Sequence, residues 1–414
     1  MFRFGIIYLI CMLELVNKLE RIVKTFPDEA LLNTLNSINR GLTISRFMQK
    51  PEVGKFIADL EKDSKYDLFH GTMQSIGPQA SSFEHDNVAA WLIIRSKEVG
   101  AEAAIDNLNN YVEADTFTAY EVALLTGLSV PRTEDIGNDV SIIPINEIPI
   151  SQLHKMISRM RHTPLFTFDG PSAILLKPFA HERIHYNPEI KGESPLRSGP
   201  VEEIKDAHLC LSTIGPNGAQ IIAHSTLAGD ETPNPLSFGW SLPGYRSRSH
   251  PKWLNQKDLS DLKTLHMSFL GLEDSLQANL RVSMERLNNY AASGDQVDKA
   301  IELGIALESL FLDDNTRDEL RFQFSLRASL LLGRTTVERH DIFDLMKSMY
   351  ELRSKAVHNG RLQKKSMKEA PLIMEMVAPL ASQAIKMMIE QKGIDWKGLI
   401  LSSPKNLFEA DLKR

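Results

Sequence analysis

The chain has 414 residues, more than a single hydrophobic core usually organises, so two or three domains are expected. Its 43% of hydrophobic and 24% of charged residues exclude a collagen-like, low-complexity or globally disordered chain. A net charge of −6 argues against a protein that coats nucleic acid with its whole surface, although a local basic patch is compatible with it. The two cysteines, Cys11 and Cys210, are too few for a disulfide framework and favour a reducing, cytoplasmic compartment.

The chain begins with Met-Phe-Arg and then an apolar run from Phe4 to Leu13, which has the outline of a signal peptide. No small-residue cleavage site follows the run, Glu14 closes it, and it is too short to cross a bilayer as a helix. We therefore expect no membrane partner. The run is expected to form a buried N-terminal helix, or to be an upstream extension with Met12 as the natural start.

The first third of the chain has the spacing of amphipathic helices. From Leu13 to Val23, apolar residues recur every three or four positions, and Pro27 ends the run. The same spacing continues, between breaks, in residues 53–60, 88–99 and 101–111, and the helical pattern extends to about Leu128. It predicts an N-terminal helical region over residues 1–135.

The middle of the chain has a different texture. Most of the prolines lie between Pro131 and Pro251, and proline breaks long helices. Short apolar or alternating runs between turn residues indicate strands at residues 142–145, 165–168, 173–176, 209–214 and 220–223, with one helix at residues 150–160. The sequence therefore predicts a β-rich or mixed middle domain over residues 136–257.

Long helical patterns return after residue 257. They cover residues 258–271, 276–292, 295–312, 316–332, 338–356 and 370–391. Gly271, Gly333 and Gly360 follow three of them, at positions where a left-handed C-terminal cap is expected. The sequence predicts a helical bundle over residues 258–414. For the whole chain it predicts a mainly α fold with an N-terminal helical region and a β-containing middle domain.

One carboxylate lies on the apolar side of a predicted helix in this bundle. Ile301, Ile305 and Glu308 fall close together on a helical wheel. A buried carboxylate needs a partner, because an isolated buried charge is strongly unfavourable. The next helix supplies Arg327, so we expect Glu308 and Arg327 to pair and to hold the bundle in register.

The end of the following helix is basic in a chain that is acidic overall. From Arg353 to Lys368 there are six Lys and Arg residues and no acidic residue, which is typical of a phosphate-binding surface. The candidate RNA-binding residues are Lys355, Arg361, Lys364 and Lys365, together with Arg321 on the preceding helix.

Arg353 and His358 have the chemistry that RNA cleavage needs. The 2′-hydroxyl of RNA attacks the adjacent phosphate without a metal if one group moves a proton and another neutralises the developing charge. Histidine suits the first role and the planar arginine cation suits the second. Five residues turn about 140° around a helix, so the two side chains do not share one stripe. They would converge better across a symmetric dimer.

The tail of the chain, roughly residues 276–391, carries four segments in order. These are Asp298, Ile-Ala-Leu-Glu-Ser-Leu-Phe at 305–311, Ser-Leu-Arg-Ala-Ser-Leu-Leu-Leu-Gly at 325–333, and Tyr-Glu-Leu-Arg-Ser-Lys-Ala-Val-His-Asn-Gly at 350–360. Together they resemble the HEPN superfamily, and most closely its ApeA-like branch from bacterial anti-phage systems. The resemblance implies a helical bundle that dimerises. It also implies a metal-independent endoribonuclease site made of an arginine, four to six intervening residues and a histidine.

Carried over by position, the resemblance implies that Arg353 and His358 are catalytic. The glycine that is common directly after the histidine stands one position later here, at Gly360. The resemblance further implies RNA as substrate, such as tRNA or mRNA, a second copy of the chain as partner, no cofactor, and a role in anti-phage defence, in abortive infection or as a toxin. The residues with an implied supporting role are Ser354, Glu308, Arg327 and Asn359.

Two alternatives to the nuclease stay open. The first is a catalytically inactive HEPN protein that binds RNA or nucleotides as a homodimer. The second is a zinc peptidase, because His181-Glu182-Arg183-Ile184-His185 matches a motif in which two histidines bind zinc and the glutamate is the general base. That motif must lie in a sustained helix, whereas a proline on either side leaves barely two turns here. A third ligand would come from Glu202 or Glu203.

A second basic cluster lies at the end of the middle domain. Its aromatic neighbours would allow it to stack on and grip single-stranded RNA, and a solvated loop is the alternative. The cluster consists of Arg246, Arg248, His250 and Lys252, with Tyr245 and Trp253 beside them.

Overall fold

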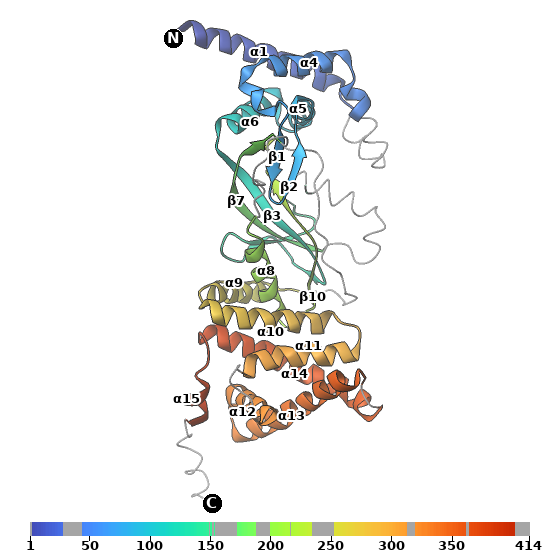
Figure 1. Cartoon of the computed structure of the whole chain (residues 1–414), viewed down its shortest axis with the longest axis vertical. Coiled ribbons are helices and arrows are strands. Elements are labelled where there is room, and N and C mark those ends of the chain that lie inside the picture. The colour runs from blue at the N-terminus through green and yellow to red at the C-terminus, as the bar shows by residue number, and fades with distance from the viewer. Residues whose placement is uncertain are drawn as a thin grey trace, which may run out of the picture.

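The computed structural model describes residues 2–27, 44–148, 150, 153, 172–187, 199–215, 217–233, 252–312, 319–361 and 364–401. Helices make up 62% and strands 16% of the described residues, so the predicted mainly α fold is confirmed there. Figure 1 shows N-terminal helices at one end of an elongated molecule, a sheet in the middle and a helical bundle at the other end.

The N-terminal helices pack around their own core. They are α1 (Phe2–Thr25), α4 (Pro51–Lys62), α5 (His85–Val99) and α6 (Ala101–Glu113), with the short 3₁₀ helix η1 (Ser64–Phe69) between them. The helices predicted at residues 53–60, 88–99 and 101–111 are therefore confirmed. A proline begins α4 at the position where a missing N–H costs nothing, and a capping box of Glu84 and Asn87 begins α5. Leu19, Phe56 and Leu92 are fully buried in this core.

A five-stranded antiparallel sheet in the order β5-β6-β7-β3-β9 forms the middle of the molecule. Its strands are β5 (Glu134–Asp135), β6 (Ser141–Pro144), β7 (Ala173–Glu182), β3 (Thr116–Thr126) and β9 (Gln220–Ala228). The strands predicted at 142–145, 173–176 and 220–223 are confirmed in β6, β7 and β9. The predicted strand at 165–168 lies outside the described residues, as does the predicted helix at 150–160 apart from Ile150 and Leu153.

Strand β3 corrects the prediction for the first third of the chain. The helical pattern was expected to extend to about Leu128, but residues 116–126 form an interior strand between β7 and β9. A strand wins because side chains at the start of β3 alternate between exposed and buried, and its end is buried on both faces. The boundary predicted at residue 135 therefore falls inside the sheet.

Smaller sheets complete the strand content of the described residues. Strands β2 (Gln79–Ser82), β1 (Met73–Ile76) and β8 (Ile184–Tyr186) form one sheet, and the two-residue strands β10 (Lys252–Trp253) and β4 (Leu128–Ser129) pair in parallel. The strand predicted at residues 209–214 is wrong. Most of that run belongs to α8 (Val201–Ser212), which buries its apolar side against β7 and β3. The free Cys210 is buried in this interface, and burial raises the pKa of its thiol.

Helices in the last third of the chain form the predicted bundle. They are α9 (Gln256–Leu270), α10 (Asp274–Ala292), α11 (Gln296–Phe311), α12 (Leu320–Leu332), α13 (Thr336–Asn359), α14 (Lys364–Glu390) and α15 (Trp396–Leu401). The predicted helices are confirmed to within a few residues at most ends, although the predicted start of α12 at 316 lies outside the described residues. Helix α14 starts six residues before its prediction.

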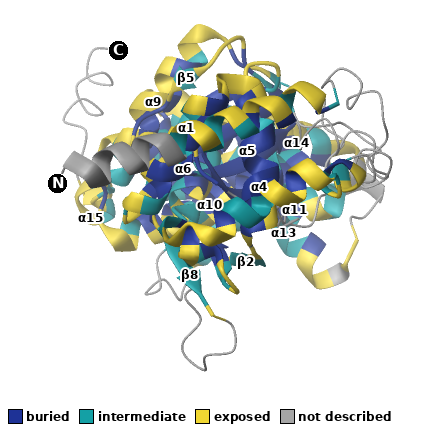
Figure 2. Ribbon diagram, turned by 90° about the horizontal axis from the view of Figure 1, so that it is seen from above, coloured by how far each residue is buried: buried dark blue, intermediate teal, exposed yellow. Residues whose placement is uncertain are grey.

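The sheet and the bundle share one continuous core. Leu125 of β3, Leu211 of α8 and Leu307 of α11 belong to the same buried cluster. In the view from above in Figure 2, buried residues gather towards the middle of the molecule and exposed residues towards its outside. Arg281 of α10 makes two hydrogen bonds, of 2.7 and 2.8 Å, to the buried carboxylate of Asp206 in α8. A bidentate pair of this kind fixes orientation as well as distance.

The three predicted glycine caps follow helices, but only one is left-handed. Gly360 has φ 60° after α13, whereas Gly271 and Gly333 both have φ −86°, so the left-handed prediction is wrong for those two. At Gly333 a close approach explains the glycine instead, because a Cβ there would lie 2.6 Å from Cγ of Arg339.

Helix α14 contains a long apolar segment. Its segment Lys368–Glu390 is long and apolar enough to cross a membrane, with a mean hydropathy of 1.4, and half of that window is buried inside the fold. It contacts α9, α10, α11, α12 and α13, which is the environment of a bundle's core helix.

Candidate active site

Arg353 and His358 both lie in the last two turns of α13. The helix begins with a capping box, in which the Thr335 hydroxyl accepts from the backbone N–H of Glu338 at 3.2 Å and the Glu338 carboxylate accepts from that of Thr335 at 3.3 Å. It ends where the N–H of Gly360 donates to the carbonyl of Ala356 at 3.0 Å. The apolar spacing covered residues 338–356 and Gly360 was predicted as the cap. The helix ends at Asn359, so His358 lies inside its final turn.

Arg353 is paired with Glu308 of α11. Its Nη2 donates to Oε2 of Glu308 at 2.8 Å, and the two side chains are 26% and 22% exposed. Burial raises the pKa of the Glu308 carboxyl, and the Arg353 charge opposes that rise. The structure therefore brings one predicted supporting residue directly onto one predicted catalytic residue.

The predicted ion pair between Glu308 and Arg327 is wrong. Arg327 is buried on α12, where its Nη1 donates to the carbonyl of Phe311 at 2.9 Å and its guanidinium lies 5.4 Å from the centre of the Trp396 ring. The orphan carbonyls at the end of α11 attract this cation, because the last turn of a helix lacks internal donors. Arg327 thus ties α12 to the end of α11 and leaves Glu308 to α13.

Gly304 is the site residue that the sequence reading missed. A Cβ at this position would lie 2.2 Å from Cγ and 2.7 Å from Cβ of Arg353, so the absence of a side chain on α11 makes room for the arginine stem. The available signal was a glycine in the interior of a predicted helix, which usually has a packing or functional reason.

The other residues of the motif are more open. His358 is exposed, and within the described part of the chain it makes no hydrogen bond or ion pair. Ser354 and Lys355 are half-buried, and Arg361 is exposed. The side chains of Asn359, Lys364 and Lys365 lie outside the described residues.

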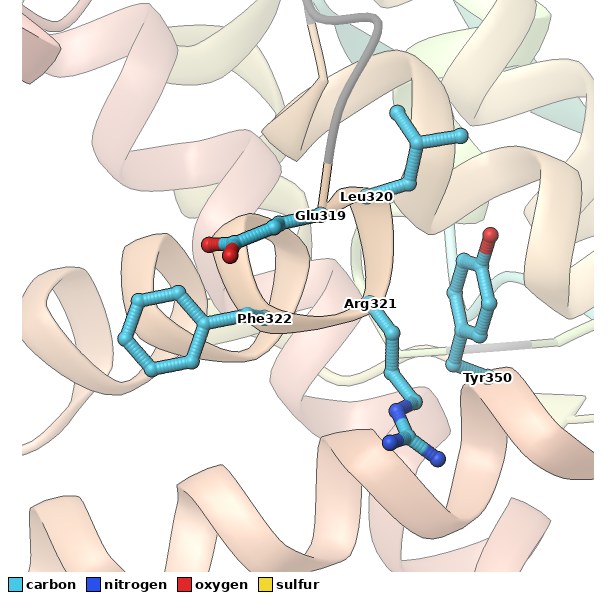
Figure 3. Close-up of a pocket in the computed structure, with 5 residues that line it drawn as sticks. All are labelled: Glu319, Leu320, Arg321, Phe322 and Tyr350. Carbon is cyan, nitrogen blue, oxygen red and sulfur yellow. The ribbon is translucent and has the colours of Figure 1, made fainter.

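A hollow of about 620 Å³ lies one turn before Arg353 along α13. Arg321, predicted to bind RNA, lines it and pairs with Glu351 of α13 at 2.8 Å. Figure 3 shows Arg321 extending from α12 and Tyr350 standing beside Leu320. The Tyr350 ring packs 5.6 Å from that of Phe324. The described residues that line the hollow are Glu319, Leu320, Arg321, Phe322 and Tyr350.

The histidine motif of the zinc-peptidase alternative does not form a helix. His181 and Glu182 end β7, and His185 lies in β8. The Nε2 of His181 accepts from the N–H of Gly77 at 3.0 Å, and its Nδ1 lies 2.6 Å from the carbonyl of Glu182, so the protein itself occupies both ring nitrogens. The helix that this alternative requires is therefore absent from residues 173–186, as the flanking prolines indicated.

The suggested third ligands point elsewhere. Glu203 pairs with Lys177 at 3.0 Å and Glu202 pairs with Lys205 at 2.7 Å. Among the described residues, no group of three His, Cys, Asp or Glu side chains is arranged to hold a metal ion. Glu203 thus ties the first turn of α8 to β7, and Glu202 forms an exposed pair within α8.

His185 gives a pH prediction. Its Nε2 lies 2.8 Å from the Tyr111 hydroxyl, and burial, with the Arg183 charge, lowers its pKa from 6.5 to about 4. The unfolded chain therefore binds more protons between these values, and His185 should reduce the free energy of unfolding by roughly 2–3 kcal/mol as pH falls through that window. Urea unfolding at pH 7 and pH 4.5 should show a smaller difference for His185→Gln. An unchanged difference would contradict this role.

The second basic cluster is described only at its end. Tyr245, Arg246, Arg248 and His250 lie outside the described residues. Lys252 donates to the carbonyl of Ile214, and burial lowers its pKa, so it is committed to the fold. Trp253 is 62% exposed. The predicted role in RNA binding stays a prediction.

Comparison with known proteins returned no relative: no family model, no curated protein and no solved structure matches the chain.

Proposed function

We propose that this chain is a metal-independent endoribonuclease of the HEPN type, with Arg353 and His358 as its catalytic residues. The observation that carries the proposal is the end of α13, where a half-buried, anchored arginine lies five residues before an exposed histidine in the same helix. The stretch around them, from Arg353 to Lys368, is basic and free of acidic residues. The order of motifs that resembles the HEPN superfamily supports the same assignment.

The proposed chemistry is an internal transesterification. The 2′-hydroxyl gives its proton to a base, the bond from O2′ to phosphorus forms, and the bond from phosphorus to O5′ breaks as O5′ takes up a proton. His358 moves these protons, and Arg353 donates to the phosphorane oxygens as negative charge develops on them. The products are a 2′,3′-cyclic phosphate and a 5′-hydroxyl.

We further propose that the site is completed by a second copy of the chain. Arg353 faces α11 while His358 is exposed, as expected for residues about 140° apart on a helix. Exposed apolar side chains at this end of the bundle would be buried by a partner, including Val357 beside the histidine, at 46% exposed. Leu372 and Met376 of α14 are 61% and 45% exposed.

A direct test treats total RNA with the wild-type protein and with His358→Ala, each with and without a chelator. We expect the wild type to cleave RNA under both conditions and the variant to leave it intact. Cleavage that persists after the substitution would move the site elsewhere. Cleavage that is lost with the chelator would instead favour a metal enzyme.

An inactive homodimer that binds RNA or nucleotides is the second candidate. It is favoured by the tie between Arg353 and Glu308, which engages the arginine before any substrate arrives. RNA binding without cleavage in the same test would support it.

We also propose that the nuclease acts in anti-phage defence or as a toxin, which rests on the resemblance alone, and that it does so in the cytoplasm, which the two cysteines favour. Induced expression in a bacterial host should then arrest growth for the wild type and not for His358→Ala.

A further inference from the structure

Helix α11 packs against α13, and the side chain of Arg353 lies directly over Gly304 of α11. The stem of Arg353 fills the space that a side chain at position 304 would need, since a Cβ there would lie 2.2 Å from the arginine Cγ. Any residue other than glycine would therefore push the arginine or separate the helices. The packing of α11 against α13 therefore explains the glycine at position 304, and its backbone conformation does not.

A glycine in mid-helix has a cost that the packing must offset. Gly304 lies within the regular helix Gln296–Phe311, where glycine is less favourable than alanine by about 1 kcal/mol. Its φ is not in the left-handed region, so the backbone does not require it. What distinguishes position 304 is the arginine stem lying against it.

Glu308 lies one turn further along the same face of α11. Residues four apart on a helix are neighbours, so the arginine stem passes over Gly304 and its guanidinium reaches Glu308. The bond from Nη2 to Oε2, at 2.8 Å, is the hydrogen bond that holds this guanidinium among the described residues. The Nε of Arg353 is buried and has no partner in that part of the chain. The hydrogen bond to Glu308 and the space left by Gly304 therefore set the position of the arginine.

We infer that Gly304 and Glu308 are positioning residues for Arg353. Gly304 leaves the space that the aliphatic part of the arginine side chain occupies, and Glu308 fixes the guanidinium by a hydrogen bond. This inference rests on the proposed function for its catalytic consequence. Glu308 acts as a hydrogen-bond acceptor here, so a glutamine that keeps an acceptor oxygen should replace it. A carboxylate beside a phosphate also repels that phosphate, which gives a further reason for glutamine to be tolerated.

The test measures kcat and KM for RNA cleavage by Gly304→Ala, Glu308→Ala and Glu308→Gln. Because a misplacement of about 1 Å can cost about 100-fold, we expect the two alanine variants to lower kcat by about 10- to 100-fold with little change in KM. Glu308→Gln should recover most of the rate. In an Arg353→Ala background, Glu308→Ala should cause no further loss.

Glu302→Gln is the matched control. Glu302 lies on the same helix and pairs with Arg286 of α10 at 3.2 Å, away from the site, so this variant should keep the wild-type rate. Equal rates for Glu308→Ala and wild type would overturn the inference. The inference would also be overturned if the loss of kcat in each alanine variant were no larger than its loss of folded protein.

A second readout separates this inference from the proposed function. In the ¹⁵N-labelled full chain, the Arg353 side-chain NMR signal, assigned by its loss in Arg353→Lys, should shift and show faster rotation in Glu308→Ala and Gly304→Ala. It should stay unchanged in Glu302→Gln. If the wild-type protein cleaves no RNA but these shifts occur, Gly304 and Glu308 position Arg353 as inferred and the nuclease proposal fails. An unchanged Arg353 signal in both alanine variants overturns the inferred positioning role of Gly304 and Glu308.

Discussion

Replacement of His358 by alanine is expected to lower kcat for RNA cleavage by about 10²- to 10⁴-fold, the range in which a positioned acid or base contributes. The histidine is exposed at the end of α13 and makes no hydrogen bond to the described parts of the fold, so its loss should leave stability unchanged. Single-turnover cleavage of a short single-stranded RNA measures the rate, and thermal unfolding measures the stability.

His340 offers a matched control for that experiment. It is another exposed histidine on α13, several turns before the motif. His340→Ala should cleave RNA at the wild-type rate. A similar loss in both variants would mean that the substitution acts through the helix and not through catalysis.

Arg353 is expected to affect both rate and stability. Removing one preorganised donor from the developing negative charge commonly costs about 10²- to 10³-fold in kcat, and Arg353→Lys should lose most of this because an ammonium cannot reproduce the planar fork. Arg353→Ala also leaves the half-buried Glu308 carboxylate without its partner. We expect this variant to be less stable than wild type by about 1–3 kcal/mol at neutral pH.

The pH dependence of that loss has a definite sign. Burial already raises the pKa of Glu308 above 4.5, and without Arg353 nothing opposes the rise. The native variant then binds more protons than the unfolded chain above pH 4.5, so its stability should fall as pH rises through this window. Urea unfolding at pH 5 and pH 8 should show a larger deficit at pH 8, and the double variant Arg353→Ala/Glu308→Gln should recover part of it. Equal deficits at both pH values would contradict this account.

The helices of the bundle were predictable because their signals are local. Apolar spacing and turn residues locate α9 to α14, and the Asn-Gly pair after His358 locates the end of α13. The same local reasoning placed the motif in the last turns of a helix. It required no knowledge of which helices are neighbours.

The partner of Glu308 was not predictable. A helical wheel shows on which face of its own helix a side chain lies, but not which residue of another helix packs against it. Both α12 and α13 present an arginine towards α11, and packing decides between them: Arg327 meets the end of α11, and Arg353 meets its middle at Gly304. The glycine was visible in the sequence, but its meaning depends on the approach of a helix 49 residues later.

Strand β3 was missed for a different reason. Its end, Val122 to Leu125, is an apolar run that periodicity cannot assign to strand or helix. Pairing with β7 and β9 resolves the ambiguity, and both partners come from later in the chain. The histidine motif shows the opposite case, in which a familiar spacing falls on strands that bury His181 between Phe117 and Phe179.

The measurement that tests the central claim most directly compares one RNA oligonucleotide with its fully 2′-O-methylated counterpart, both incubated with the wild-type protein and excess chelator. Attack by the 2′-hydroxyl predicts that the RNA is cut to fragments with 2′,3′-cyclic phosphate ends and that the methylated strand stays intact. The same RNA should survive incubation with His358→Ala. Cleavage of the methylated strand, or cleavage of RNA by the variant at the wild-type rate, would contradict the proposed site.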